Sequence, residues 1–163
     1  MKKRVPFIAV IALVTVAALS SGTASAHSER ARGRVEVARG QVVTLAGGQD
    51  LGYDISGHAL MMRTRHRTFV AVHVRGLDVD TTYPAHVHNA PCSATTPGGG
   101  HYQHEIGGPV DAVNEIWPTV TTNHRGRGWG HATHDQRARP DAMSIVIHYP
   151  PDTSIRLACV DLT

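Results

Sequence analysis

The chain has 163 residues, 41% of them hydrophobic and 18% charged, which suits one folded domain, or one domain with an appendage, and excludes a disordered chain. The formal net charge is +3, but three basic residues fall within the first four positions, and residues 27–163 hold equal numbers of basic and acidic residues. The basic balance therefore gives no support to nucleic-acid binding, and we expect no nucleic-acid partner. All 12 histidines follow residue 26, which points to chemistry based on imidazole groups.

Residues 1–26 have the features of a secretory signal peptide. A positive start at residues 2–4 precedes an apolar run at residues 7–19, and residues 24–26 form a small-residue cleavage site. The apolar run has about 13 residues, which is short of the roughly 20 that span a bilayer, so we favour a signal peptide over a membrane anchor. We expect an exported domain over residues 27–163, with no membrane association after cleavage.

The chain has two cysteines, Cys92 and Cys159. In an oxidising compartment they can form a disulfide, and the alternative is a pair of free buried thiols. A bridge between them would close a loop of about 67 residues and stabilise the fold by about 3–4 kcal/mol. Export therefore favours the disulfide.

The first part of the domain contains pairs of short extended segments. Strands are predicted at residues 35–37 and 41–45, on either side of a turn at residues 38–40. A second apolar pair follows at residues 50–62 and 68–75, and the latter has valines at every second position, as a strand requires.

The second part of the domain continues this pattern around a long loop. A turn is predicted at residues 76–80 and an extended segment at 84–89. Residues 90–115 are rich in proline, glycine and polar groups and form a long loop, which in a compact domain is usually functional. No stretch has a sustained helical period, so the domain is predicted to be all-β, a sandwich or a barrel. The remaining strands are predicted at residues 117–122, 128–134, 144–149 and 155–161.

A histidine pair gives the clearest chemical signal. His86 and His88 lie one residue apart in an extended segment, so their side chains share a face and could hold one metal ion. Taken alone, this spacing is a weak signal, and two surface histidines on an edge strand would be the favoured interpretation. Two further histidines strengthen the metal hypothesis, because His101 lies in a glycine-rich segment and His148 ends an apolar run.

The order of these motifs resembles that of the Cu/Zn superoxide dismutases. The resemblance covers roughly residues 33–163 and implies an all-β, eight-stranded Greek-key β-barrel or sandwich with a long loop at the metal site. The matching segments are Gly76-Leu77, His86-Val87-His88, Cys92, Gly100-His101-Tyr102, Val146-Ile147-His148 and Arg156-Leu157-Ala158-Cys159.

The resemblance also implies roles for single residues. His101 matches the histidine that bridges copper to zinc in the family, and Arg156 matches the arginine that draws the anion toward copper. Both are therefore expected to be catalytic. Cys92 and Cys159 match the family's disulfide. The implied copper ligands are His86, His88 and His148, together with His101.

The chemistry of the residues agrees with copper. Neutral imidazoles bind Cu(II) more tightly than the other first-row divalent ions. A metal that is stable in two oxidation states can take an electron from one superoxide and give it to the next. We therefore expect superoxide as the substrate, with dioxygen and hydrogen peroxide as the products.

The zinc part of the family pattern is incomplete. The family has a histidine before a GGP-like turn, where this chain has Ile106. His104 with Asp111 or Glu115 could form an altered zinc site, but tetrahedral zinc needs a full ligand set, so we expect no zinc. The outer nitrogen of His101 then needs another partner, for which the carboxylate candidates are Glu105, Asp111 and Glu115.

The segment between His148 and Arg156 is also short. The family usually has a long charged loop there that steers superoxide toward the metal. The missing loop predicts an exposed copper site and resembles the copper-only branch of the family, which lacks both zinc and this loop.

Two other functions fit parts of the pattern. A non-enzymatic secreted protein that binds or buffers copper on the same fold is the main alternative, and it would show little turnover. A cupin oxygenase needs a glutamate four or five residues after the histidine pair, where Cys92 and Ser93 stand. The sequence leaves the oligomeric state open.

Three more histidines lie close together at residues 124, 131 and 134. His131 and His134 have the spacing H-x-x-H and could form a secondary metal site. Such histidines are more often solvated, and we favour that interpretation.

Overall fold

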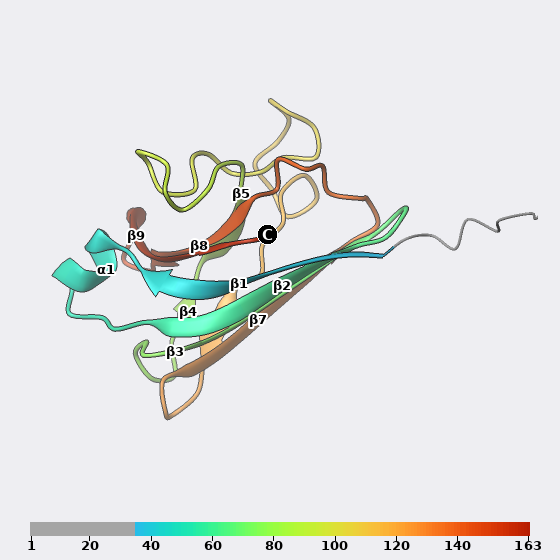
Figure 1. The fold of residues 1–163 in the computed structure, drawn as a ribbon. Coiled ribbons are helices and arrows are strands. Elements are labelled where there is room, and N and C mark those ends of the chain that lie inside the picture. The colour runs from blue at the N-terminus through green and yellow to red at the C-terminus, as the bar shows by residue number, and fades with distance from the viewer. Residues whose placement is uncertain (1–34) are drawn as a thin grey trace, which may run out of the picture. The chain divides into compact units, whose positions relative to one another are not determined.

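The computed structural model describes residues 35–163, so the predicted signal peptide lies outside the described residues. This part of the chain contains nine strands and one short helix, α1 (Ala46–Asp50), as Figure 1 shows. The strands are β1 (Glu36–Thr44), β2 (Ser56–Arg63), β3 (Thr68–Arg75), β4 (Thr82–Tyr83), β5 (Ala85–His88), β6 (Val120–Thr122), β7 (Arg127–His134), β8 (Ser144–Tyr149) and β9 (Asp152–Asp161).

The strands form one antiparallel sheet that curls into a nearly closed barrel. Their order is β4-β6-β7-β3-β2-β1-β9-β8-β5. The two ends of this order, β4 and β5, are separated in the chain by Pro84 alone. The predicted all-β barrel is confirmed, with nine strands in place of the expected eight.

Strand β1 takes part in both layers of the barrel. One layer contains β2, β3 and β7, and the other contains β5, β8 and β9 (Figure 1). The first seven residues of β1 pair with β2. Its last two residues, Val43 and Thr44, pair with Cys159 and Ala158 of β9.

The turn predicted at residues 38–40 is wrong, because these residues continue strand β1. Gly40 pairs with Ala59 of β2 and passes against the end of β9. A Cβ atom at position 40 would lie 1.8 Å from the carbonyl oxygen of Asp161. Glycine is needed here for the close approach of two backbone segments and not for a change of chain direction.

Helix α1 was not predicted, and its place is set by packing against β9. It has only five residues, too few for a helical period to appear in the sequence. Its glycines lie under β9, where a Cβ at Gly48 would come within 2.3 Å of the carbonyl oxygen of Leu157. Strand β2 accordingly begins at Ser56 and not at residue 50.

The core lies between the two layers. Val70, Val72 and Val74 of β3 are buried, which confirms the alternation predicted for this strand. From the opposite layer, Ile145 and Ile147 of β8 are equally buried and belong to the same cluster. Complete burial of each such aliphatic side chain stabilises the fold by roughly 1.5–3 kcal/mol.

The predicted long loop is confirmed between β5 and β6, where only isolated bridges interrupt it. A disulfide between Cys92 and Cys159 attaches the start of this loop to β9. The backbone N–H of Cys92 also donates to Oδ1 of Asp161, at 2.7 Å. The start of the loop is therefore held by the disulfide and by this hydrogen bond.

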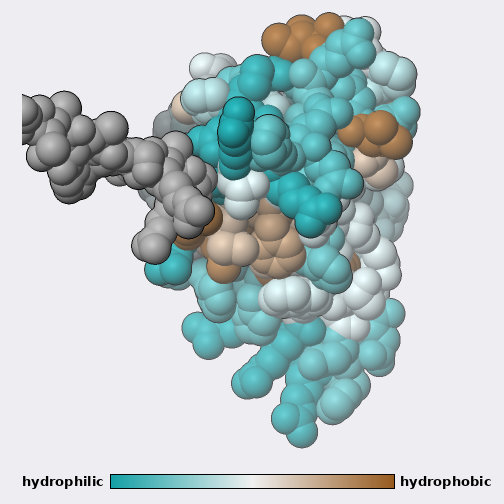
Figure 2. Space-filling model, turned by 90° about the vertical axis from the view of Figure 1, so that its right-hand side faces the viewer, coloured by the Kyte–Doolittle hydropathy of each residue, from teal (hydrophilic) through white to brown (hydrophobic). Residues whose placement is uncertain are grey.

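The far part of the loop lies at the top of Figure 1. Figure 2 shows hydrophobic side chains exposed at the top of the molecule.

None of the helices in residues 35–163 is long and apolar enough to cross a bilayer.

Candidate metal centre

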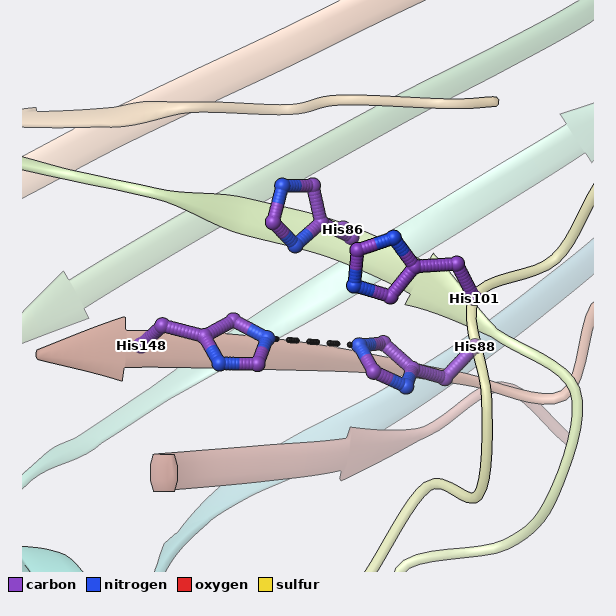
Figure 3. A group of neighbouring side chains, drawn as sticks. All are labelled: His86, His88, His101 and His148. Carbon is purple, nitrogen blue, oxygen red and sulfur yellow. Dashed lines mark hydrogen bonds between the residues drawn. The ribbon is translucent and has the colours of Figure 1, made fainter. Parts of the chain in front are cut away.

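The four histidines that the sequence singled out come together beside strands β5 and β8. His86 and His88 extend from β5, and His148 lies near the end of β8, which pairs with β5 (Figure 3). His101 comes from the long loop and forms an isolated bridge with His88. Each of the four rings offers one nitrogen, and these atoms all lie within 4.8 Å of one another.

Local backbone geometry explains how two elements deliver these side chains. Val87, between His86 and His88, points into the core, so the two histidines point to the other face of β5. The loop then folds back over His88, which is completely buried. At His148 the pairing between β8 and β9 shifts register, and Arg156 pairs with His148 at this point.

The hydrogen bonds of two rings fix which of their nitrogens is free. Nδ1 of His148 lies 2.7 Å from the carbonyl oxygen of Thr153, and Nδ1 of His88 lies 3.3 Å from that of Gly99. A carbonyl oxygen only accepts, so both Nδ1 atoms carry the proton and donate it. The Nε2 atom of each neutral ring therefore has an unprotonated lone pair.

These lone pairs face one another. Nε2 of His88 and Nε2 of His148 are 3.3 Å apart, joined by the dashed line in Figure 3. With both protons held at Nδ1, this contact has no hydrogen to share, so it is not a true hydrogen bond. Two facing lone pairs at this distance repel unless a cation lies between or beside them.

The third and fourth rings complete the donor set. Nδ1 of His101 donates to Oε2 of Glu115 at 2.7 Å, which leaves Nε2 of His101 as the free nitrogen. Nδ1 of His86 is buried and has no hydrogen-bond partner. The cluster therefore offers three Nε2 atoms and one Nδ1 atom to a common point, and this set fits a metal ion that prefers imidazole.

The buried rings are held neutral. Burial lowers the pKa of His86 to about 3 and that of His88 to about 2, and the neighbouring His101 and His148 lower both further. Burial also lowers the pKa of His148 to about 4. Neutral imidazole is the form that can bind a metal, so protons compete weakly for these three rings near pH 7.

Glu115 is the carboxylate that partners His101. Its side chain is 1% exposed, and its Oε2 also accepts the indole N–H of Trp117 at 2.9 Å. Nε2 of Gln103 donates to the other oxygen at 3.3 Å. Of the three carboxylates proposed from the sequence, Glu115 therefore takes this place, and it fixes both the orientation of the His101 ring and its protonated nitrogen.

The other two residues of the altered zinc site lie elsewhere. Oδ1 of Asp111 accepts the backbone N–H groups of Val113 and Asn114, both at 2.9 Å, and so holds a turn. His104 contacts Tyr102 and not the cluster. Within residues 35–163, the four histidines are the only group of three or more histidine, cysteine, aspartate or glutamate side chains close enough to share an ion.

Arg156 connects the site to the loop above it. Nη2 donates to the carbonyl oxygen of Gly99 at 2.8 Å, and Nη1 donates to that of Pro97. Gly99 is also the residue whose carbonyl accepts Nδ1–H of His88. The charge of Arg156 lies close enough to lower the pKa of both His88 and His148.

Several contacts of the site were not predicted from the sequence. Trp117 was assigned to packing, but its ring also meets that of His86 edge-on, with centroids 5.5 Å apart. Gln103 carried no signal, and the carbonyls of Gly99 and Thr153 are backbone groups that no motif reveals. Trp117 follows Glu115 by two residues, and this spacing was the one sequence feature that could have indicated that Trp117 belongs to the site.

The fold resembles that of a known class of protein. The antiparallel, nearly closed barrel, whose long loop is bound to the last strand by a disulfide, is similar in fold to a Cu/Zn superoxide dismutase. Among solved structures, the chain is similar to the Cu/Zn superoxide dismutase from Brucella abortus, with a TM-score of 0.53 and 14% sequence identity. The alignment covers 78% of this chain and 100% of the other, so the fold expected from the sequence is confirmed.

Sequence comparisons alone find no relative. No protein-family model matches the chain, and no curated protein matches it.

Proposed function

We propose that the chain is an exported superoxide dismutase that uses copper. The observation that carries this proposal is the pair of Nε2 lone pairs of His88 and His148, which face each other at 3.3 Å with two more imidazole nitrogens beside them. Four neutral nitrogen donors suit Cu(II) better than the other first-row divalent ions. The resemblance in fold to the Brucella enzyme supports the same conclusion.

Bound copper would supply the electron chemistry, oxidising one superoxide to dioxygen and reducing the next, with two protons, to hydrogen peroxide. The residues of the chain position that ion and its substrate. His86, His88 and His148 are ligands on strands, where the backbone pairing of β5 with β8 fixes their separation. Strand positions hold ligands more rigidly than loops do.

His101 and Arg156 have the two catalytic roles. Glu115 holds the proton of His101 at Nδ1, so that Nε2 faces the ligand nitrogens of the other rings. Arg156 places a permanent positive charge beside the cluster and attracts the superoxide anion. Both residues depend on the long loop, because His101 is part of it and Arg156 donates to its carbonyl groups.

The centre at His101 has no place for zinc in this proposal. His101 matches the histidine that bridges copper to zinc in the family, but its Nδ1 atom donates to Glu115 in this chain. His104 and Asp111 do not approach it. We therefore propose a copper-only centre.

Loading the protein with metal tests this function. We expect one copper ion per chain, an electron paramagnetic resonance spectrum of nitrogen-coordinated Cu(II), and fast decay of superoxide after pulse radiolysis. His148→Ala should lose this spectrum and the turnover, whereas His66→Ala, an exposed control, should keep both. Tight copper binding without superoxide decay would instead identify a copper-binding or buffering protein.

Other observations support the proposal that the protein is exported. The Cys92–Cys159 disulfide is typical of an oxidising compartment, and the sequence of residues 1–26 fits a signal peptide. Mass spectrometry of the protein recovered from the culture medium or periplasm should give a chain that begins near His27. An intact Met1 in the recovered protein would contradict cleavage.

A further inference from the structure

A second pair of histidines comes together outside the four-histidine cluster. His104 lies in the long loop and His134 is the last residue of β7. Their ring centroids are 5.1 Å apart, and the ring planes are inclined by 37°. Two imidazoles that share one ion through bonds of about 2.0–2.1 Å fit such a separation.

One nitrogen of this pair is buried without a partner. Nε2 of His104 makes no hydrogen bond within the described residues. Its Nδ1 lies 3.2 Å from the hydroxyl oxygen of Tyr102, and this oxygen also accepts the backbone N–H of Arg139. When Nδ1–H donates to Tyr102, Nε2 is left with a free lone pair. A buried polar atom without a partner destabilises the fold, and a bound cation would offset this cost.

The charges around the pair permit a cation. Burial lowers the pKa of both His104 and His134, so both rings are neutral near pH 7. Arg139 opposes a cation, but its guanidinium is paired with Asp141 at 2.9 Å. Asp135 follows His134 in the chain, but its carboxylate is paired with Arg67 at 2.8 Å.

An open surface pocket adjoins His104. It has a volume of about 360 Å³, and Glu105, Asp111 and Gln136 also line it, whereas His134 is not among its lining residues. The two acidic residues attract a cation electrostatically toward His104, and the open space leaves room for water ligands. Water from this pocket can therefore complete the coordination shell of an ion that the two imidazoles hold.

We propose that His104 and His134 form a second metal site, which binds a divalent transition ion such as Zn²⁺ together with water. The sequence paired His134 with His131, but residues three apart on a strand point to opposite faces. His131 instead lies on the outer face, where its Nδ1 accepts the indole N–H of Trp129 at 3.2 Å. This second site uses none of the four clustered histidines.

Zinc counting by equilibrium dialysis of the full chain tests the proposal. Zn²⁺ will also enter the four-histidine cluster, so the informative quantity is the difference between variants. The wild-type chain should bind one more Zn²⁺ per chain than His134→Ala. His131→Ala, which removes a histidine from the outer face of the same strand, should bind as many ions as the wild type. Equal zinc counts in the wild type and His134→Ala would overturn the site.

A spectroscopic measurement on the unaltered chain locates the ion independently of any folding defect. In long-range ¹H–¹⁵N spectra of the histidine rings, added Zn²⁺ should shift the ring nitrogens of His104 and His134 and leave those of His131 in place. Unmoved His104 and His134 signals at saturating Zn²⁺ would overturn the proposal. Neither result bears on copper turnover, so the second site can fail while the proposed dismutase stands.

Discussion

Glu115 shows how one buried side chain sets the properties of a proposed metal ligand. Its carboxylate accepts hydrogen bonds from His101, Trp117 and Gln103, and no lysine or arginine pairs with it within the described residues. A carboxylate in this position raises the basicity of the histidine that it contacts. The sequence identified Glu115 only as one of three candidates, because the choice depends on how the loop folds.

Replacing this carboxylate tests its effect on copper. Glu115→Gln keeps the size of the side chain and removes its charge, so His101 should bind copper less strongly. We expect copper affinity to fall by about 10–100-fold, measured by competition with a chelator. Glu105→Gln serves as the matched control, because Glu105 is exposed. Equal affinities for the two variants would show that the contact with His101 is unimportant.

Arg156 combines a charge with two hydrogen bonds, and substitutions can separate the two. Arg156→Ala should slow superoxide decay by roughly tenfold or more and reduce its dependence on ionic strength, while copper remains bound. Arg156→Lys keeps the charge and should recover most of the rate. Arg39→Ala removes a distant exposed arginine and should change neither. An unchanged rate constant for Arg156→Ala would remove this residue from the mechanism.

At the scale of elements, the strands were easier to predict than their ends. Strands β3, β7 and β8 match their predicted ranges within one residue, because their buried side chains alternate or form continuous apolar runs. Strand β1 was divided in error at Gly40. Helix α1 could not be predicted, since its five residues depend on contact with β9.

Gly40 gives a direct test of the contact between β1 and β9. Gly40→Ala would place a methyl group against the carbonyl of Asp161, so the strands must move apart. We expect the free energy of unfolding to fall by about 1–3 kcal/mol in urea titrations. At Gly100 the nearest atom to an added Cβ would be 3.6 Å away, so Gly100→Ala should be tolerated. Similar losses in both variants would contradict the close approach at Gly40.

At the scale of the whole molecule, the free energy of unfolding is linked to the four-histidine cluster through proton binding. In the unfolded chain the histidines have a pKa of about 6.5, whereas the folded chain lowers the pKa of His86, His88 and His148. The unfolded state therefore binds more protons below pH 6.5. As the pH falls from 6.5 toward 4, each of these histidines should reduce the stability of the metal-free protein, by at most about 1.4 kcal/mol per pH unit.

Urea unfolding of the metal-free protein at pH 7, 5.5 and 4.5 measures this effect. The wild type should lose stability more steeply with acid than His148→Ala, because the variant lacks one of the three groups. The difference between the two slopes removes the contribution of carboxylates common to both proteins. Parallel slopes would show that burial of His148 does not shift its protonation.

The sequence predicted features that neighbouring residues determine better than contacts between residues far apart in the chain. The all-β class followed from short strands and the lack of a helical period, whereas the barrel and the four histidines followed from ordered motifs that resemble a known family. The partners of the rings did not follow, because the carbonyls of Gly99 and Thr153 and the carboxylate of Glu115 reach them only through the folded loop. The pairing of His104 with His134 likewise joins a loop to a strand end.

The path of β1 through both layers has a mechanical consequence. Strand β1 is hydrogen-bonded to β2 along most of its length and to β9 at its end. The two layers can therefore separate only when β1 loses its hydrogen bonds to one of them. Melting should therefore be all-or-none, with circular dichroism and tryptophan fluorescence reporting a single shared transition.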